Sequence, residues 1–298
     1  MSRWPGKYVI GLTGNIATGK SVVRKMLEHL GAYGIDADAL AHRAMAKGAP
    51  GYPLILKTFG EWILDEDDQI DRQRLAKIAF SDPKALERLE SIVHPLVAHA
   101  VDLLIRRAKQ SIVVIEAIKL LESELVAGCD TIWVVDAPAE LQVARLMHKR
   151  KMSEAAARQR IAAQAPQALK LRAAKVVIRN NGSFENTWDQ VQAAWAELPQ
   201  PEEPLLPEPP EAKPGQLIVR RGRPQDADDI ARFITHVTHG KKRMTRQDVM
   251  AAFGEKAFLL LLRDGEIAGI AGWQVENLVT RIDELYFVPG LALDEAIP

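Results

Sequence analysis

Residues Gly14-Asn15-Ile16-Ala17-Thr18-Gly19-Lys20-Ser21 match the phosphate-binding pattern G-x-x-x-x-G-K-[ST] without a gap. The stretch follows a short apolar segment at 8–12 and precedes apolar residues at helical spacing, which end before Gly31, a plausible helix C-cap. A strand, a glycine-containing loop and a helix N-terminus form an anion site, because backbone N–H groups converge on phosphate oxygens and the helix dipole favours negative charge. The stretch therefore predicts an α/β fold built around bound phosphate.

Residue types in this loop have separate expected roles. Gly14 and Gly19 permit a backbone geometry and a close approach that a Cβ would obstruct. Lys20 is expected to reach the β- and γ-phosphates, and the Ser21 hydroxyl to bind Mg²⁺. We therefore predict that a nucleoside triphosphate is bound by Gly14, Asn15, Ile16, Ala17, Thr18, Gly19, Lys20, Ser21 and Val22.

Composition indicates an ordinary globular protein of one or two domains. The 298 residues carry 39 Lys plus Arg and 39 Asp plus Glu, so no global attraction to nucleic acid or membrane is expected. The single cysteine, Cys129, suits a reducing cytosol and is expected to be a small buried residue. The first residues lack the apolar core of a signal peptide, and no apolar stretch is long enough to span a bilayer. We expect a cytoplasmic location.

A proline-rich segment divides the chain. Residues 199–215 read PQPEEPLLPEPPEAKPG, with seven prolines and four glutamates. Such a segment favours an extended polyproline conformation and does not continue a helix or a sheet. We interpret it as a linker between a first domain at 1–198 and a second at 216–298.

The first domain alternates strand and helix patterns. Several of the strand candidates are almost continuously apolar, which is typical of a parallel sheet buried on both faces. The alternation predicts a three-layer αβα domain with a parallel sheet and ligands at the carboxyl ends of its strands. Strands are expected at 8–12, 33–36, 112–116, 131–136 and 175–179, and helices at 20–30, 38–46, 72–79, 83–108, 138–164 and 184–197.

Three carboxylates lie at the expected carboxyl edge of this sheet. Asp36 ends the second strand, where a carboxylate can accept a proton from an acceptor hydroxyl; the alternative is a turn residue. Asp38 is best interpreted as the cap of a helix that starts at Ala39. Glu116 ends the third strand, where an acid can support Mg²⁺, although a strand-terminal acid without a metal role is equally compatible.

A basic stretch follows the fourth strand. Residues 145–175 contain nine Lys or Arg and one acid, Glu154. A solvated helix face explains such a run, but a lid carrying arginines would also neutralise charge on a transferred phosphoryl group and exclude water that would otherwise hydrolyse ATP. Arg145 and Arg150 are the candidates for that role.

Two further positions are weaker candidates. In the turn after the last strand, Asn181 is a candidate contact for an adenine edge, although turn chemistry explains Asn-Gly equally well, and Ser183 is expected to cap the next helix. His94 is held as a possible substrate contact, although a lone histidine is more often structural.

The first domain resembles the dephospho-coenzyme A kinases. The resemblance implies ATP-dependent phosphorylation of the ribose 3′-hydroxyl of dephospho-CoA, the last step of coenzyme A synthesis, with Asp36 as the acceptor-activating aspartate and Thr13 and His94 on the substrate side. It also implies a CoA-binding region over 38–105 and a lid over 145–172. The matching residues, in the order of the family, are Gly11-Leu12-Thr13-Gly14, Gly19-Lys20-Ser21, Ile35-Asp36-Ala37-Asp38, Phe80-Ser81-Asp82-Pro83, His94-Pro95, Val135-Asp136-Ala137-Pro138, Arg160-Ile161 with Gln164, and Val177-Ile178 with Asn181-Gly182-Ser183.

The chain departs from the family pattern at named positions. Asn15 and Ala17 stand where glycines are usual, and Val22 stands where threonine is usual. Phosphate binding by the Ala17 amide is expected to survive if the φ angle of Ala17 is negative. Lys119 lies in a stretch where the family usually has D-x-P-L-L-F-E, and Arg179 stands where aspartate is common, so local substrate and adenine contacts are expected to differ.

The second domain reads as a small α+β unit. A strand near 217, a capped helix, a hairpin at Arg263-Asp264-Gly265 and a third strand at 283–289 follow in order. This order resembles the front half of a GNAT-type N-acetyltransferase, but the pyrophosphate loop of that family is not found before residue 298. We expect a partial, truncated module and do not predict acetyl transfer.

Other functions remain open from the sequence. One alternative is a nucleoside or nucleotide kinase with another acceptor, and a second is a CoA-sensing protein that acts through its C-terminal module. A GTPase switch is disfavoured because no N-K-x-D motif occurs.

Overall fold

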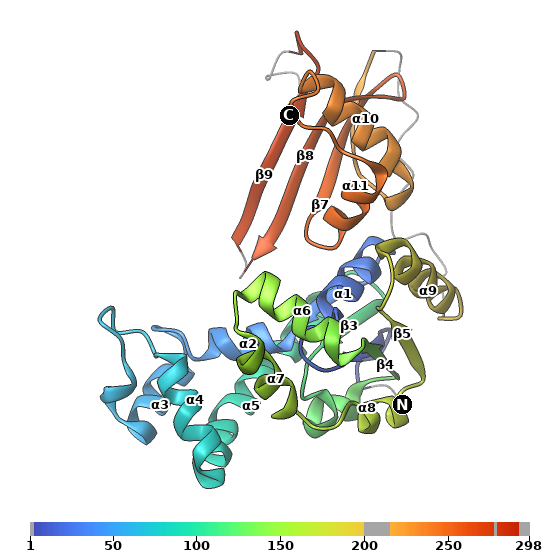
Figure 1. Cartoon of the computed structure of the whole chain (residues 1–298). Helices are drawn as coiled ribbons and strands as arrows, with labels where there is room; N and C mark the ends of the chain where they lie inside the picture. The colour runs from blue at the N-terminus through green and yellow to red at the C-terminus, as the bar shows by residue number, and fades with distance from the viewer. Residues whose placement is uncertain (1–2, 200–214, 277–278, 292–298) are drawn as a thin grey trace. The chain divides into compact units, whose positions relative to one another are not determined.

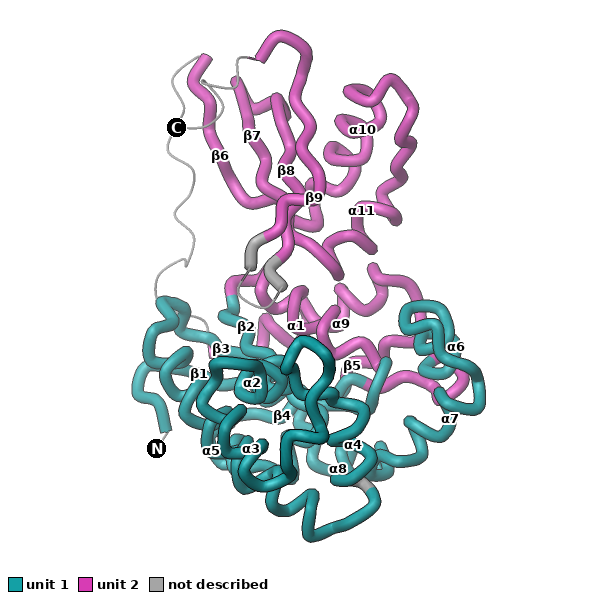
Figure 2. The backbone as a smooth tube through the Cα atoms, turned by 90° about the vertical axis from the view of Figure 1, so that its left-hand side faces the viewer, with its two compact units in different colours: residues 1–17, 32–135, 142–177 teal, residues 18–31, 136–141, 178–298 magenta. Residues whose placement is uncertain are grey.

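The computed structural model describes residues 3–199, 215–276 and 279–291. The chain forms two compact units, shown in different colours in Figure 2: residues 1–17, 32–135 and 142–177, and residues 18–31, 136–141 and 178–298. Almost all of the linker expected at 199–215 lies outside the described residues. No helix among the described residues is long and apolar enough to cross a membrane.

The first sheet is parallel, as expected, wherever its pairing is described. Its strands are β1 (Tyr8–Thr13), β2 (Tyr33–Asp36), β3 (Ile112–Glu116), β4 (Thr131–Asp136) and β5 (Val176–Arg179), in the order β2-β3-β1-β4-β5. β3 pairs with β2 and β1, and β1 pairs with β4, all in parallel. Every residue of β3 is buried, which explains its uninterrupted apolar run up to Glu116.

Helices of the first unit pack around α5 (Pro83–Arg107), which is contacted by α2 (Ala37–Ala44), α3 (Gly51–Phe59) and α4 (Arg72–Ser81). α5 begins at Pro83 because Asp82 caps it, accepting a hydrogen bond from Lys84 N at 2.9 Å. Its buried side chains Val97, Val101 and Ile105 join Ile35 of β2 and Val113 of β3 in one apolar core.

The helix expected at 138–164 is two helices. α6 (Ala139–Arg150) ends before Lys151, whose φ of 52° does not continue a helix, and Ser153 caps α7 (Glu154–Ala162). A further short helix, α8 (Gln167–Ala173), and α3 were not predicted. The first unit also has the 3₁₀ segments η1 (Glu61–Ile63), η2 (Leu120–Glu122) and η3 (Glu124–Gly128).

The second unit contains α1 (Lys20–His29), α9 (Phe184–Ala196) and a four-stranded antiparallel sheet. α1 contacts α9, and Gly31 follows α1 with a φ of 112°, as expected of a residue after a helix C-cap. The sheet has the order β6 (Leu217–Arg221), β7 (Ala257–Arg263), β8 (Glu266–Glu276) and β9 (Val279–Phe287).

The hairpin between β7 and β8 confirms the prediction from Asp264-Gly265, whose φ angles are 53° and 84°. Between β6 and β7 the chain forms η4 (Pro224–Asp226), α10 (Ala227–Val237) and α11 (Arg246–Phe253). α10 and α11 cover one face of the sheet, where Phe258, Leu260 and Ile270 are buried (Figure 1).

Candidate active site

The phosphate-loop backbone has three residues with positive φ. These are Gly14 (148°), Ala17 (60°) and Gly19 (102°). The two glycines occupy conformations for which an L side chain is unsuited, so the backbone geometry predicted for them is confirmed, whereas their contact with a nucleotide stays a prediction. The negative φ on which phosphate binding by the Ala17 amide was made conditional is not found, and the left-handed conformation costs an L-residue roughly 1–2 kcal/mol.

α1 begins directly after the loop. The Gly19 carbonyl accepts hydrogen bonds from Val22 N at 3.0 Å and Val23 N at 3.1 Å, which closes the first turn of the helix. Lys20 is the first residue of α1 and is buried. The amide of Val22 is therefore used inside the helix, whereas the predicted nucleotide role of Val22 remains untested.

Two loop amides are bonded to glutamine side chains. Asn15 N donates to Gln167 Oε1 at 3.0 Å, and Ile16 N donates to Gln164 Oε1 at 2.8 Å. Gln167 also donates from Nε2 to the Val135 carbonyl at 3.0 Å. The residues before and at the start of α8 thus fix the first half of the loop, a role that the sequence analysis did not assign to either glutamine.

Arg145 lies at the loop, as the lid hypothesis requires. Its Nη1 donates to the Ala17 carbonyl at 3.0 Å, and burial lowers the pKa of its guanidinium. Arg150, at the end of α6, is close enough to His42 of α2 to lower the pKa of that imidazole. The two arginines chosen from the sequence therefore lie in different surroundings, one at the phosphate loop and one towards α2.

Asp36 and Glu116 are adjacent at the carboxyl edge of the sheet. They are direct register partners of β2 and β3, and Glu116 is also the partner of Leu12 in β1. Glu116 is 4% exposed, so its carboxylate is removed from bulk water. Two acidic side chains thus end neighbouring strands at the edge where ligands of parallel sheets bind.

The cap of α2 is Asp36 rather than Asp38. α2 starts at Ala37, and Asp36 Oδ1 accepts a hydrogen bond from Ala39 N at 2.8 Å. Asp38 lies in the first turn and accepts from Ile118 N through Oδ2 at 3.2 Å. The predicted cap at Asp38 is wrong because the helix begins two residues earlier than expected.

Ile118 is a junction that the sequence did not reveal. Its carbonyl accepts from Thr13 Oγ1 at 3.1 Å and from Lys170 Nζ at 2.8 Å. Thr13 is fully buried, so its hydroxyl serves this internal contact. The unusual Lys119 pairs with Glu90 of α5 at 2.7 Å. His94, one turn further along α5, is exposed.

A cleft of about 630 Å³ lies beside the end of α2 and the start of α4. Burial is the main cause of the lowered pKa of its residue His42; the Arg72 cation lowers the pKa further, and Asp36 acts in the opposite direction. His42 therefore lies within electrostatic reach of Asp36. The cleft is lined by His42, Met45, Ala46, Asp65, Gln69, Ile70, Asp71, Arg72 and Gln73.

The turn after β5 places Asn180, not Asn181, against the phosphate loop. Asn180 is buried, donates from Nδ2 to the Thr18 carbonyl at 2.8 Å and accepts from Thr187 Oγ1 at 3.2 Å. Asn181 is exposed. Ser183 caps α9, as predicted, by accepting from Asn186 N at 3.1 Å.

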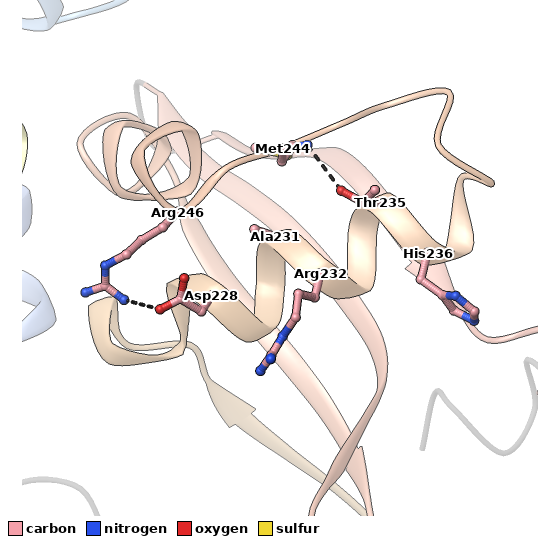
Figure 3. Close-up of a pocket in the computed structure, with 7 residues that line it drawn as sticks. All are labelled: Asp228, Ala231, Arg232, Thr235, His236, Met244 and Arg246. Carbon is pink, nitrogen blue, oxygen red and sulfur yellow. Dashed lines mark hydrogen bonds and ion pairs between the residues drawn. The ribbon is translucent and has the colours of Figure 1, made fainter.

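A second cleft, of about 520 Å³, lies in the C-terminal part of the chain (Figure 3). Arg246 Nη1 is paired with Asp228 Oδ2 at 2.8 Å, and Met244 N donates to Thr235 Oγ1 at 3.2 Å. Arg232, on the same helix as Asp228, is paired with Asp229. The polar groups of this cleft do not converge on one point, unlike those at the sheet edge.

Metal binding would rest on a small set of oxygen donors. In the part of the chain that the structure describes, no group of three or more His, Cys, Asp or Glu residues is arranged to hold a metal ion. Mg²⁺ at phosphate sites commonly uses one or two carboxylates together with the substrate phosphates, so a single strand-end acid such as Glu116 fits that chemistry.

Comparison with known proteins agrees with these features. The family model for dephospho-CoA kinase matches residues 8–186. A dephospho-CoA kinase of Moorella thermoacetica is 43% identical over 195 residues, covering 64% of this chain and 92% of that protein. One from Geobacter sulfurreducens is 41% identical over 191 residues, covering 63% of this chain and 97% of that protein.

A solved structure supports the fold of the same region. The structure of TT1252 from Thermus thermophilus is similar with a TM-score of 0.59 and 33% identity, covering 65% of this chain and 99% of that one. The family match, the relatives and the parallel sheet with its glycine loop all coincide on the first part of the chain. The chain therefore belongs to the dephospho-CoA kinase family, ATP-using P-loop kinases of the final step of coenzyme A biosynthesis.

Proposed function

We propose that this chain phosphorylates the ribose 3′-hydroxyl of dephospho-CoA with ATP and that Asp36 is the general base. The hydroxyl oxygen forms a bond to the γ-phosphorus, the bond from that phosphorus to the bridging β,γ-oxygen breaks, and ADP leaves. The hydroxyl proton passes to Asp36. The observation that carries this proposal is that Asp36 and Glu116 are register partners of neighbouring strands at the carboxyl edge of the sheet.

The capping bond of Asp36 orients its carboxylate. Because Oδ1 accepts from Ala39 N, the side chain is held in one orientation relative to α2. Within the described ranges no hydrogen bond is made by Oδ2, so we assign proton acceptance to that oxygen. An oriented carboxylate is a suitable base for an alcohol attacking phosphorus.

Cations are assigned to the transferred phosphoryl group. Lys20 follows the loop glycine and would bind the β- and γ-phosphates, as the motif requires. Arg145, which donates to the Ala17 carbonyl, would add positive charge at the loop when the transition state forms. Arg150 is assigned to the lid.

Mg²⁺ would be held by the Ser21 hydroxyl and the Glu116 carboxylate, which are oxygen donors of the kind this ion prefers. When bound, it would neutralise charge on the β- and γ-phosphates. Glu116 is buried and is paired in register with Asp36, so its own position is fixed by the sheet.

Dephospho-CoA is assigned to the cleft beside α2 and α4. Arg72 supplies positive charge for a pyrophosphate, and the cleft adjoins a histidine within electrostatic reach of Asp36. Thr13 and His94 remain substrate-side candidates, and only the resemblance to the family supports them. The Thr13 side chain is buried and the His94 side chain is exposed, so neither adds structural support. On the nucleotide side, Asn181 keeps its proposed adenine contact.

Acceptor competition tests the function. Steady-state kinetics with dephospho-CoA, AMP, shikimate and nucleosides should give the highest kcat/KM for dephospho-CoA. A preference for any other acceptor would identify the chain as a different P-loop kinase. Lys20→Ala, assayed in parallel, should lose most turnover, which ties the measured activity to this site.

We propose three parts for the whole chain: a kinase domain at 1–198, a linker at 199–215 and a GNAT-like module at 216–298. The antiparallel order β6-β7-β8-β9, with α10 and α11 inserted after β6, supports the likeness. No acetyl transfer is proposed. Cytoplasmic location is supported by the reducing environment that a lone cysteine suits.

A CoA-sensing role for the module is the second candidate, because a module follows the kinase region. Removing residues 199–298 tests it, since the family model matches residues 8–186 and the relatives are covered to 92% and 97% by matches of 195 and 191 residues. An unchanged kcat and an unchanged affinity for CoA would leave the module without a role in the reaction.

A further inference from the structure

Lys170 is a fully buried lysine outside the residues so far assigned to catalysis. It lies on α8 and is 2% exposed. Lysine is almost never buried to this extent unless its ammonium group is paired, because removing the charge from water is costly. Its Nζ donates to Asn15 Oδ1 at 3.0 Å and to the Ile118 carbonyl at 2.8 Å. The charge is therefore placed between the phosphate loop and the segment after β3.

The contact with Asn15 uses a side chain that the usual glycine would lack. Asn15 Oδ1 accepts from Lys170, and Asn15 Nδ2 donates to the Ala165 carbonyl at 3.2 Å. The carboxamide is thus held at both ends by residues 165–170. Because Gln164 and Gln167 bind the adjacent loop amides, this segment fixes both the side chain and the backbone at the start of the loop.

The contact with Ile118 reaches the acceptor side. The Ile118 peptide lies two residues beyond Glu116, and its N–H donates to Asp38 at the start of α2. Its carbonyl accepts from both Lys170 and Thr13. Movement of the Ile118 backbone would therefore disturb contacts at the end of β1 and at the first turn of α2, which Asp36 caps. It would also shift the segment that follows the end of β3.

We propose that Lys170 is a positioning residue that holds the phosphate loop and the Asp36–Glu116 edge in fixed relation through Asn15 and Ile118. It touches neither ATP nor the acceptor in this account. Its effect on transfer rests on the proposed function, whereas its effect on the two segments does not. A small misplacement of reacting groups can reduce a rate by about 100-fold.

Two readouts in the full chain test the proposal. The first is amide hydrogen exchange, followed by mass spectrometry, in peptides covering 13–22 and 116–120. Lys170→Met should accelerate exchange in both peptides, and Lys170→Arg should restore part of the protection. Arg172→Met, which removes an exposed cation from the same helix, is the matched control and should change neither peptide. Unchanged exchange in both peptides of Lys170→Met would overturn the proposal.

The second readout is kinetic. Lys170→Met should lower kcat by about 10- to 100-fold with KM for ATP changed by less than about threefold, because misplacement affects transfer more than binding. If kcat stays within twofold of wild type, the positioning role is wrong. Wild-type chain with no turnover of dephospho-CoA would count against the proposed function alone, since the exchange readout still decides the role of Lys170.

Should Lys170→Met fail to fold, Asn15→Ala provides the alternative variant. It removes the carboxamide and leaves the lysine with the Ile118 carbonyl. Faster exchange in 13–22 with lowered kcat would support the proposal. Exchange and kcat equal to those of wild type would contradict it.

Discussion

Asp36 and Glu116 are register partners at the carboxyl ends of the parallel strands β2 and β3, and Asp36 also caps α2. One carboxylate thus has a structural and a proposed chemical role. Because a cap orients the same oxygen pair that would accept a proton, the two roles are compatible, and they can be separated by substitution.

Substituting Asp36 with asparagine separates its role as a helix cap from its proposed role as a base. Asparagine caps helices about as well as aspartate, so the stability of Asp36→Asn should stay close to that of wild type. The base is lost, so kcat should fall by about 10²- to 10⁴-fold. Thermal denaturation checks the predicted stability, and steady-state kinetics check the predicted fall in kcat. Asp36→Ala, the comparison variant, should lose activity and also about 1 kcal/mol of stability. If kcat of Asp36→Asn fell by less than about tenfold, Asp36 would be a positioning residue and not the general base.

Substituting Ala17 with glycine should stabilise the protein. Ala17 has a φ of 60°, which costs an alanine but not a glycine roughly 1–2 kcal/mol, partly offset by the greater freedom of an unfolded glycine. Ala17→Gly should therefore raise the free energy of unfolding by up to about 1 kcal/mol, measured by urea denaturation. Ala193→Gly, at an exposed position inside α9, is the control and should lose about 0.5–1 kcal/mol. Equal losses in both variants would refute the strain at Ala17.

Cys129 should be unreactive in the folded protein. Burial, with a smaller contribution from Asp130, raises the pKa of its thiol to about 12, and Sγ donates to the Leu125 carbonyl at 3.4 Å. At pH 8 the thiolate fraction is then about 1000-fold below that of a thiol with pKa 9.0. Labelling by a disulfide reagent should be slow in native protein, fast in urea, and faster as pH rises. Complete native labelling within minutes at pH 8 would show that the thiol is not so shielded.

Strands and caps were predictable because their signals are local. The strands at 33–36, 112–116 and 131–136 have the predicted bounds. For 112–116 and 131–136 the reason is the apolar run that a sheet buried on both faces requires. The cap at Ser183 was predicted for the same reason, because the serine bonds an amide three residues away.

Tertiary contacts account for what the sequence did not reveal. Lys170 belongs to a basic run that is typical of a solvated helix face, yet it is buried against Asn15, 155 residues away. Asn180 and Asn181 are chemically identical, and only the path of the turn decides that Asn180 meets Thr18. The break at Lys151 carries neither glycine nor proline, and its local signal is Ser153, the cap of α7, which was not recognised within the basic run.

The central claim is transfer of the γ-phosphoryl group to the 3′-hydroxyl of dephospho-CoA. The most direct measurement is the product formed from ATP, Mg²⁺ and dephospho-CoA by the full chain, identified by mass and by the phosphorus resonance of its phosphate. We predict stoichiometric ADP and CoA carrying a 3′-phosphate, with none formed by Lys20→Ala. ADP released without phosphorylated acceptor, or a phosphate at another position, would contradict the account.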